Sequence, residues 1–301
     1  MESAHAIRSV GHDVVFGNAE KILVDYLSGN PDKKAVVIAD ENTLKHCWSA
    51  LVSKAPSLSA IEVITIDSGE QNKNIAVASV IWKKFSDMRL SRNDVVINLG
   101  GGVVTDLGGF VAASFKRGVN FIQVPTSLLA MVDASVGGKV GVDLDGLKNL
   151  VGSFATPEMV IIDTSFLDTL PQRQIVCGYA EILKHGLILD KAYWQKTISG
   201  SVEDLDHVKS LVVRSVELKN QVVVTDFKEK GDRKKLNFGH TIGHALETYF
   251  LNSDVELLHG EAVAVGMMVE SYLSVAAGLL SAGDFDEIKS EIQELEETLK
   301  L

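Results

Sequence analysis

The chain has 301 residues, of which 46% are hydrophobic and 23% charged, and its formal net charge is −11. This is the composition of a globular protein with one large domain or two ordinary ones. The acidic balance disfavours a nucleic-acid partner or an anionic membrane surface. No apolar run is long enough to span a bilayer, and the N-terminus MESAHAIRSV lacks the apolar core of a signal peptide.

The first half of the chain alternates short β-branched runs with helical patterns. The runs fall at residues 34–40, 61–67, 94–100, 120–125 and 159–163, and one helical pattern covers residues 71–87. Near-continuous apolar strands with helices between them are typical of a parallel sheet covered on both faces. We predict an α/β domain of residues 1–164 with a Rossmann-like sheet.

After Asp163 the pattern changes to long amphipathic stretches, and we predict no further strand. The stretches cover residues 172–190, 203–224, 237–250, 259–278 and 284–300. A period of about 3.6 residues is typical of helices with one buried face. We therefore predict a second, all-helical domain of residues 165–301.

The two cysteines, Cys47 and Cys177, are far apart and form no C-x-x-C pair. Such cysteines are typical of reduced thiols in the core of a cytoplasmic protein.

Positive charges gather in glycine- and histidine-rich motifs, which predicts a local pocket for a small anion. The basic residues in or beside these motifs are Lys116, Arg117, Lys139, Lys148, Lys184, Lys219, Arg233, Lys234 and Lys235. For any single lysine, a solvated surface position is the simpler interpretation.

The stretch DVVINLGGGVVTDLGG reads as a buried strand, a triple-glycine turn and the start of a helix. Glycines there let the backbone approach a ligand, and the helix N-terminus offers N–H groups to a phosphate. Thr105 stands where the dinucleotide fingerprint G-x-G-x-x-G requires its third glycine. A tight turn without a ligand is therefore the alternative.

Two other predicted strands end in polar side chains. Asp40 ends one strand, and Glu70 and Lys73 follow the next. Each could cap a helix or form a turn. Because ligands of open parallel sheets bind at the carboxyl ends of strands, three such ends together favour a nucleotide.

The stretch VDASVGGKVGVDLDGLKN, residues 132–149, resembles a phosphate-binding P-loop only superficially. Asp133 replaces the first glycine, and Val140 follows Lys139 where Ser or Thr would hold magnesium. We interpret it as a glycine-rich loop presenting Lys139, Lys148 and Asn149, groups that suit oxyanions.

Histidines at helical spacing raise the question of a metal. His240 and His244 lie four residues apart in NFGHTIGHALE, so they share a helix face, and Thr241 excludes the H-E-x-x-H motif of zinc peptidases. Further candidate ligands come from LLHGEAVAVG and GYAEILKHG: His259, Glu261, Glu181 and His185. Two histidines and a carboxylate with an open position form a catalytic zinc set, but spacing alone does not choose among these residues. For His185, an ordinary hydrogen-bonded helix position is the favoured interpretation.

Six motifs, in order, resemble the 3-dehydroquinate synthases, a family of sugar-phosphate cyclases. They are GGGVVTDLGGF, FIQVPTSLLAMVDASVGGK, LKNLVGSF, GYAEILKHG, LNFGHTIGHALE and LHGEAVAVGM, and with DSGEQNK the resemblance covers residues 34–275. The resemblance implies NAD in the α/β domain and zinc, with cobalt as an alternative ion, in the helical domain. It also implies conversion of 3-deoxy-D-arabino-heptulosonate 7-phosphate into 3-dehydroquinate and phosphate, in the shikimate pathway.

The resemblance also implies roles for individual residues. The implied metal ligands are Glu181, His240 and His259. The implied catalytic residues are Asp133, Lys139, Lys184, Lys219 and His244, the last handling a proton. The implied substrate-binding residues are Arg117, Lys148, Asn149, Arg233 and Asn237. The implied NAD contacts are Asp40, Glu70, Lys73, Gly101, Gly102, Asp106, Thr126 and Ser127. Because the family's arginine equivalent to Arg117 reaches a neighbouring subunit's site, a homodimer is implied.

Two features depart from the family pattern. Leu147 separates Gly146 from Lys148, where the family has glycine directly before lysine. The sequence ends at Leu301, whereas family members continue through further helices with a lysine that reaches the substrate. We expect a chain shortened relative to its family.

Three alternatives stay open. Another cyclase, of the 2-deoxy-scyllo-inosose or 2-epi-5-epi-valiolone type, would take a substrate without a carboxylate. A metal-dependent polyol dehydrogenase would release NADH in proportion to product. A truncated, inactive protein would bind NAD but catalyse neither of these reactions. Arg233, Asn237 and His244 all fit the dehydroquinate type, which we favour.

Overall fold

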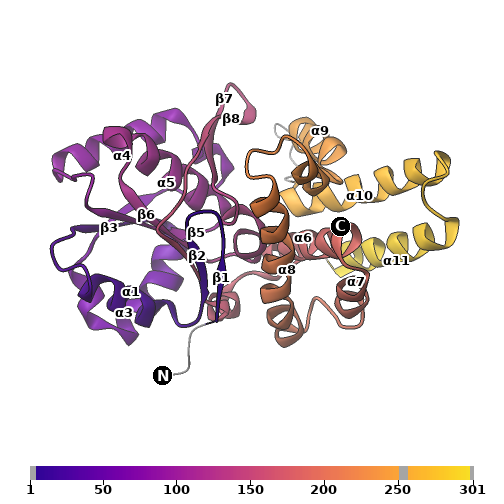
Figure 1. Ribbon diagram of the computed structural model, residues 1–301, viewed down its shortest axis with the longest axis horizontal. Coiled ribbons are helices and arrows are strands. Elements are labelled where there is room, and N and C mark those ends of the chain that lie inside the picture. Colours follow the sequence, from indigo (N-terminus) through magenta and orange to yellow (C-terminus); the bar gives the residue numbers. More distant parts are fainter. Residues whose placement is uncertain (1–4, 251–256, 299–301) are drawn as a thin grey trace. The chain divides into compact units, whose positions relative to one another are not determined.

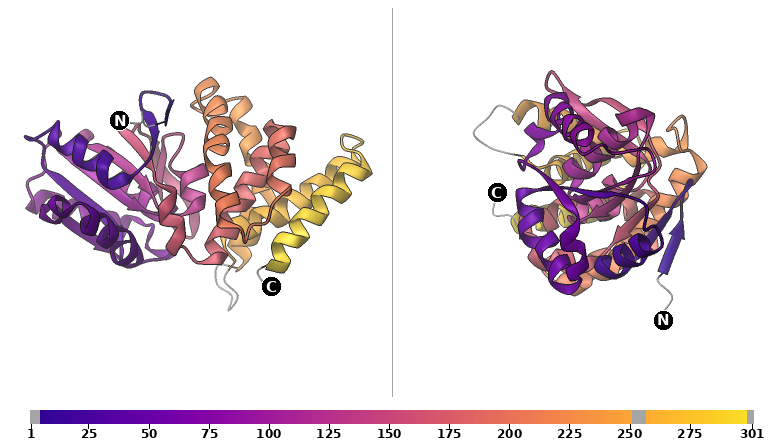
Figure 2. Two further views of the ribbon diagram at one scale, coloured as in Figure 1. Left: turned by 90° about the horizontal axis from the view of Figure 1, so that it is seen from below. Right: turned by 90° about the vertical axis from the view of Figure 1, so that its left-hand side faces the viewer.

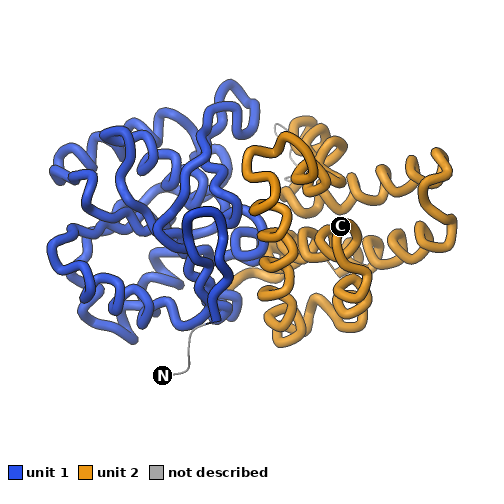
Figure 3. The backbone as a smooth tube through the Cα atoms, viewed as in Figure 1, with its two compact units in different colours: residues 1–169 blue, residues 170–301 orange. Residues whose placement is uncertain are grey.

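The computed structural model describes residues 5–250 and 257–298. The chain divides into two compact units, Met1–Thr169 and Leu170–Leu301 (Figure 3). The division falls at the end of a short 3₁₀ helix, Thr164–Thr169, whereas the predicted boundary follows residue 164. Among the described helices, none combines the length and apolarity needed to cross a bilayer.

Unit 1 is built on a seven-stranded sheet with the order β1-β2-β9-β6-β5-β3-β4. Neighbouring strands are parallel except for the antiparallel β1–β2 pair at one edge. The strands are β1 His5–Arg8, β2 Asp13–Phe16, β3 Ala35–Asp40, β4 Glu62–Ile66, β5 Val95–Gly100, β6 Asn120–Pro125 and β9 Met159–Ile162. All five predicted strands are confirmed, whereas β1 and β2 were not predicted.

Helices cover both faces of this sheet, with α4 and α5 on one side and α1 and α3 on the other (Figure 1). The α-helices of unit 1 are α1 Ala19–Ser28, α2 Glu41–Thr43, α3 Ser49–Lys54, α4 Ile75–Asp87 and α5 Gly102–Ser114. Apolar side chains from β3 and β5, such as Ile38 and Val96, pack with Phe85 of α4 and Leu107 of α5. The fold class predicted for this half is therefore confirmed as an α/β domain, whose mostly parallel sheet is covered by helices on both faces.

Helix α4 begins later than the predicted start at residue 71. Glu70–Asn72 form one 3₁₀ turn instead, and Asn74 caps α4 by accepting the Val77 N–H at 3.0 Å. An asparagine at the N-cap position stabilises a helix start because its side chain satisfies an otherwise unpaired N–H.

The predicted loop between residues 132 and 149 was wrong over its second half. Residues 139–154 form an antiparallel hairpin of β7 Lys139–Leu144 and β8 Leu147–Phe154. Asp145 and Gly146 connect the strands, with φ of 51° and 78°. Asp-Gly is the preferred pair for such a two-residue turn, because both positions need positive φ.

Within its described residues, unit 2 contains helices and no strand, as predicted. The α-helices are α6 Gln172–Leu189, α7 Lys191–Ile198, α8 Leu205–Thr225, α9 His240–Phe250, α10 His259–Ala276 and α11 Ala282–Thr298. Helices α10 and α11 pack side by side (Figure 2). The last two residues of the final predicted helix, 299–300, lie outside the described residues.

Two details of unit 2 were not predicted. A 3₁₀ helix, Asp232–Asn237, precedes α9, which therefore begins at His240 rather than at residue 237. Helix α7 begins after Asp190, whose carboxylate accepts the N–H groups of Ala192 and Tyr193 at its N-terminus.

Both cysteines are buried and free, which confirms the predicted reduced thiols. Burial raises the pKa of Cys47 to about 11 and that of Cys177 to about 12. Both thiols are therefore protonated at neutral pH and chemically quiet.

Candidate functional site

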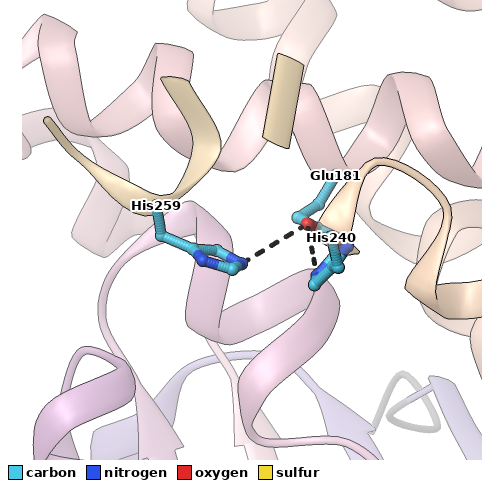
Figure 4. Close-up of side chains that lie close together, drawn as sticks. All are labelled: Glu181, His240 and His259. Atoms are coloured by element: carbon cyan, nitrogen blue, oxygen red, sulfur yellow. Dashed lines mark ion pairs between the residues drawn. The ribbon is translucent and has the colours of Figure 1, made fainter. Parts of the chain in front are cut away.

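Three helices of unit 2 bring one polar side chain each to a common point. Glu181 comes from α6, His240 from the start of α9 and His259 from the start of α10. The Nε2 atom of each histidine lies 3.7 Å from Oε1 of Glu181 (Figure 4). One potential ligand atom from each of the three side chains lies within 4.8 Å of the other two. Glu181 is 0% exposed, whereas the side chains of His240 and His259 are 12% and 25% exposed.

The outer nitrogen of each imidazole has a partner that fixes the ring. His240 Nδ1 lies 3.1 Å from the carbonyl oxygen of Phe238. His259 Nδ1 lies 3.3 Å from both carboxylate oxygens of Glu247. Carbonyl and carboxylate oxygens accept hydrogen bonds, so we assign the proton to Nδ1 in both rings. Both Nε2 lone pairs then face the Glu181 carboxylate, an arrangement that fits a divalent metal ion.

Glycines bring the three helices into close contact. A Cβ atom at Gly260 would overlap the backbone of Cys177, which lies one turn before Glu181 on α6. A Cβ at Gly266 would overlap the carbonyl oxygen of Gly239, the residue before His240. A side chain at either position would push apart helices that carry the candidate ligands. The glycines of these two motifs therefore set the spacing of the metal group.

Two residues that the sequence left open as ligands have structural roles. Arg173 donates to Glu261 through Nε at 2.6 Å and Nη2 at 2.8 Å. Glu261 also accepts the Leu258 N–H at 2.7 Å, which caps α10. His185 Nδ1 lies 2.7 Å from Ser215 Oγ, which confirms the interpretation of His185 as a hydrogen-bonded helix residue.

His244 lies beside the metal group on α9. Its ring centroid is 5.4 Å from that of His240 and 6.0 Å from that of His259. Its side chain is 54% exposed, against 12% for His240. Solvent access distinguishes His244 from the candidate ligands and suits a residue that exchanges protons.

The remaining predicted residues of unit 2 lie on α6, α8 and the 3₁₀ helix before α9, elements that pack on one another. Lys184 forms an ion pair with Glu181, and both are buried. Lys219 and Arg233 are also buried, and Arg233 donates to the carbonyl of Phe227 at 2.6 Å. Asn237 is exposed and donates to Glu229 at 2.9 Å.

In unit 1, the predicted nucleotide contacts follow the carboxyl ends of β3, β4, β5 and β6. β3 and β5 are neighbours in the sheet. From β3 the chain continues to β4 in one direction along the strand order, and from β5 it continues to β6 in the opposite direction. Asp40 ends β3, and Gly101 follows β5, so they flank the point where the strand order reverses. Ligands of open α/β sheets bind at such a point.

The end of β5 and the end of β6 are tied together by their backbones. Thr126 donates its N–H to the carbonyl of Gly100 at 3.0 Å. A Cβ at Gly101 would lie 3.3 Å from Oγ of Ser127, tighter than an ordinary contact. Gly102 begins α5, whose first N–H groups point out of the helix N-terminus. The turn therefore offers a phosphate a backbone surface without side chains.

Asp40 serves as a helix cap in this structure. Its carboxylate accepts the Thr43 N–H at 2.8 Å, and the Thr43 hydroxyl accepts the Asp40 N–H at 3.0 Å. This reciprocal pair is a capping box, so the structural role considered for Asp40 is confirmed. The predicted ribose contact stays a prediction.

Lys73 is the centre of a charged cluster in unit 1. Its Nζ lies 3.1 Å from Asp106, 3.2 Å from Glu70 and 3.9 Å from Asp143. Lys73 is only 4% exposed, and burial alone would lower its pKa, but the three carboxylates outweigh burial and raise it. Lys73 is therefore charged at neutral pH.

Asp143 was missed by the sequence analysis, and it connects this cluster to the β7–β8 hairpin. Its N–H donates to the carbonyl of Lys73 at 2.8 Å, and its carboxylate accepts the Asn149 N–H at 2.7 Å. Asn149 has a φ of 53°, a conformation that asparagine tolerates well. Lys148 also approaches Glu70, at 3.7 Å. The position of the predicted anion-binding residues on β8 thus depends on the cluster around Lys73.

The other predicted residues of unit 1 are less enclosed. Asp133 is partly buried in a short helical segment after β6, and Lys139 is exposed at the start of β7. Arg117 is exposed at the end of a 3₁₀ turn and has a φ of 64°.

Comparison with known sequences gives one consistent family. Residues 63–177 match the family profile described as 3-dehydroquinate synthase N-terminal, and residues 178–301 match the one described as 3-dehydroquinate synthase C-terminal. The 3-dehydroquinate synthase of Parabacteroides distasonis is 42% identical over 263 residues, which are 87% of this chain and 74% of that protein. The enzyme of the same name from Streptococcus pyogenes is 40% identical over 279 residues, 92% of this chain and 77% of that protein.

Solved structures show the same fold. A 2-epi-5-epi-valiolone synthase from Streptomyces hygroscopicus, with NAD+ and Zn2+ bound, has a TM-score of 0.86 at 27% identity, over 97% of this chain and 82% of that one. A 2-deoxy-scyllo-inosose synthase complexed with carbaglucose-6-phosphate, NAD+ and Co2+ has a TM-score of 0.87 at 24% identity, with the same two coverages.

Proposed function

The chain belongs to the 3-dehydroquinate synthase family, and we propose that it converts 3-deoxy-D-arabino-heptulosonate 7-phosphate into 3-dehydroquinate and inorganic phosphate. This would place it in the shikimate pathway as a carbon–oxygen lyase. The observation that carries the proposal is the convergence of Glu181, His240 and His259 within a chain that matches both family profiles.

NAD and one divalent ion, zinc or cobalt, are the cofactors of the proposal. Two related cyclases hold NAD+ with Zn2+ or Co2+. In this chain, Glu181, His240 and His259 would hold the ion. Two observations support this fit. The Nε2 atoms of both histidines lie 3.7 Å from Glu181 Oε1, and their Nδ1 atoms are hydrogen-bonded to Phe238 and Glu247. When bound, the ion would supply Lewis acidity to substrate hydroxyls, and NAD would supply a reversible hydride acceptor.

For NAD, we propose the carboxyl edge of β3, β5 and β6. Asp40 would face the ribose, and the turn at Gly101 and Gly102 would face the pyrophosphate. The proposed contacts also include Glu70, Lys73, Asp106, Thr126 and Ser127. Lys73 is held by Asp106, Glu70 and Asp143, so it would act mainly by fixing the loops around the cofactor.

The substrate carries a phosphate and a carboxylate, and it needs cationic and amide partners for both. We propose Lys139, Lys148, Asn149, Arg233 and Asn237 for this purpose. Asp133, Lys184 and Lys219 would position the substrate's hydroxyls, and His244 would move a proton. Holding a flexible seven-carbon chain in a reactive geometry is itself a large contribution to the rate.

A homodimer and a cytoplasmic location are further parts of the proposal. The exposed Arg117 could reach a second copy of the chain, as the family resemblance implies. Two free, buried thiols agree with a reducing compartment.

The competing function is that of a cyclase whose substrate lacks a carboxylate. The test is phosphate release from the seven-carbon sugar acid phosphate and from an equivalent sugar phosphate without the carboxylate, with NAD and zinc present. The proposal expects release from the acid only, and Arg233→Met should reduce that release. Release from the second substrate alone would favour the other cyclases.

A further inference from the structure

Glu247 is a buried carboxylate beside the candidate metal group that neither the sequence analysis nor the proposed function includes. It lies on α9, seven residues after His240 and therefore on the same helix face. It is only 4% exposed, which is rare for a glutamate unless a partner offsets its loss of hydration.

Two histidines lie close to the carboxylate of Glu247. Both of its carboxylate oxygens lie 3.3 Å from Nδ1 of His259, and Oε2 lies 4.0 Å from Nε2 of His244. The contact with His259 is within hydrogen-bonding distance, whereas the approach to His244 is only an ion-pair distance. The main interaction of Glu247 with these two rings is therefore the hydrogen bond to His259 Nδ1, the nitrogen that faces away from Glu181.

The two candidate histidine ligands are held differently. His240 donates Nδ1–H to a backbone carbonyl, Phe238 O, at 3.1 Å. His259 instead donates to the carboxylate of Glu247, and hydrogen bonds to ionised carboxylates are stronger than those to backbone carbonyls. An acceptor behind a metal-bound imidazole fixes its tautomer and orientation and makes its other nitrogen a better donor.

We propose that Glu247 is a positioning residue: it holds the His259 ring so that Nε2 faces the metal, and it strengthens that nitrogen as a ligand. This rests on the proposed metal site, and it adds a residue that determines how tightly the ion is held. His244, Glu247 and His259 also lie close enough together to hold an ion themselves. A second ion there would have to replace the proton on Nδ1 of His259, whose Nε2 already binds the first ion in this proposal. Positioning is therefore the simpler role for Glu247.

The test is the zinc affinity of the metal-free full-length protein, measured by competition with a chromophoric chelator. Glu247→Gln keeps the size and an acceptor oxygen but removes the charge, and Glu247→Ala removes both. We expect a 10- to 100-fold weaker zinc affinity for the alanine variant and a smaller loss for glutamine. Asp286→Asn, an exposed position on α11 with the same change in charge, should leave the affinity unchanged.

Three further measurements separate positioning from other roles. With cobalt in place of zinc, the visible absorption bands should shift in both Glu247 variants, because the geometry around the ion changes. NAD affinity and the melting temperature of the metal-free protein should stay near those of the unaltered protein, which shows that the variants fold. His244→Ala should bind zinc within about twofold of the unaltered protein, well below the 10-fold effect expected for a residue behind a ligand.

Zinc affinities within twofold for both Glu247 variants would overturn the role of Glu247 while leaving the metal site intact. Two zinc ions per chain, with only the weaker one lost in the variants, would make Glu247 a ligand and overturn positioning. No zinc binding by the unaltered protein would overturn the metal site and Glu247 together. Phosphate release by the unaltered protein tests the proposed function separately from all of these.

Discussion

The candidate sites of the two units are built in different ways. In unit 1, the site is a set of strand ends and helix N-termini, and its charged side chains bind one another around Lys73. In unit 2, the site is three side chains from three helices, and packed glycines and hydrogen-bonded rings fix their positions.

This difference predicts different sensitivity to change. A backbone surface at strand ends follows from the topology of the sheet and tolerates replacement of single side chains. A metal group needs its ligand atoms placed within a few tenths of an ångström, so it depends on each ligand and on every close helix contact behind it. Single substitutions should therefore damage the site of unit 2 more than that of unit 1.

The largest effect is expected from removing a candidate ligand. His240→Ala should abolish stoichiometric zinc binding and reduce phosphate release by more than about 100-fold, beyond the range for residues that act behind a ligand. NAD affinity should change little, because every proposed NAD contact belongs to unit 1. Zinc content, phosphate release and NAD titration on one preparation check this, and normal zinc content in the variant would contradict the ligand assignment.

The next largest effect is expected from the helix contact at Gly260. Gly260→Ala places a Cβ against the backbone of Cys177, which cannot move without displacing α6. We expect a loss of about 3 kcal/mol in the free energy of unfolding, the upper end for overpacked sites. Urea unfolding measures it. Gly283→Ala, where the nearest atom is 4.0 Å from the added Cβ, is the control and should change stability by less than about 0.5 kcal/mol.

In unit 1, the strongest single effect should come from Lys73→Met. It leaves Asp106, Glu70 and Asp143 without their shared cation, and we expect a loss of about 2 kcal/mol, below the range for fully buried pairs because these carboxylates are partly exposed. The folded-state pKa of Lys73 is raised, so its contribution is complete below the unfolded pKa of about 10.4 and is lost as pH rises through the folded value.

The difference in unfolding free energy between Lys73→Met and the unaltered protein should therefore be constant from about pH 6 to 9 and shrink above about pH 10.4. A difference that already shrinks between pH 7 and 9 would show that Lys73 loses its proton far earlier than its carboxylate partners allow.

Asp94 lies at the amino end of β5. Replacing it tests whether a change at the amino edge of the sheet affects NAD binding at the carboxyl edge. Its carboxylate accepts the N–H groups of Ser91 at 2.6 Å and Lys34 at 2.9 Å. Burial opposes ionisation there, but these hydrogen bonds outweigh it and lower the pKa of Asp94. The stability that it contributes is present above the unfolded pKa of about 3.9 and is lost as pH falls through the lower folded value.

Asp94→Asn should therefore cost about 1 kcal/mol of stability at pH 7 and progressively less in acid. NAD affinity should be unchanged, because the candidate nucleotide site lies at the opposite, carboxyl edge. Thermal unfolding between pH 3 and 7, with NAD titration at pH 7, measures both; weaker NAD binding would show that the edges are coupled.

The smallest effect is expected from Asp40→Asn. Asparagine caps helices about as well as aspartate, so stability should change by only a few tenths of a kcal/mol. If Asp40 also binds the ribose, loss of its charge should weaken NAD binding about fivefold. Asp40→Ala should lose both the cap and the contact. Unchanged NAD affinity in the asparagine variant would leave Asp40 as a cap alone.

The sequence predicted regular structure wherever a long periodic pattern existed. The five strands β3, β4, β5, β6 and β9 and the long helices of unit 2 follow directly from apolar runs and amphipathic spacing. The β7–β8 hairpin was missed because residues 132–149 were interpreted as one glycine-rich loop, although Asp145-Gly146 is itself a hairpin signal.

The site was predicted only in part, because spacing does not show which side chains meet. The sequence alone left Glu261 and His185 as possible ligands. In the structure, Glu261 accepts hydrogen bonds from Arg173, 88 residues away in sequence, and His185 is hydrogen-bonded to Ser215. Glu247 was overlooked although it shares a helix face with His240, since its role depends on His259 of the following helix. Such contacts between distant segments are set by the tertiary fold and leave no local pattern in the sequence.

The most direct test of the proposed function follows two products at once. The protein is mixed with the seven-carbon sugar acid phosphate, NAD and zinc, while inorganic phosphate and the absorbance of NADH are recorded together. We expect phosphate to be released over many turnovers without lasting NADH, because the hydride returns to the same substrate. NADH that accumulates in step with product, or no phosphate from a protein with bound zinc and NAD, would contradict the proposed function.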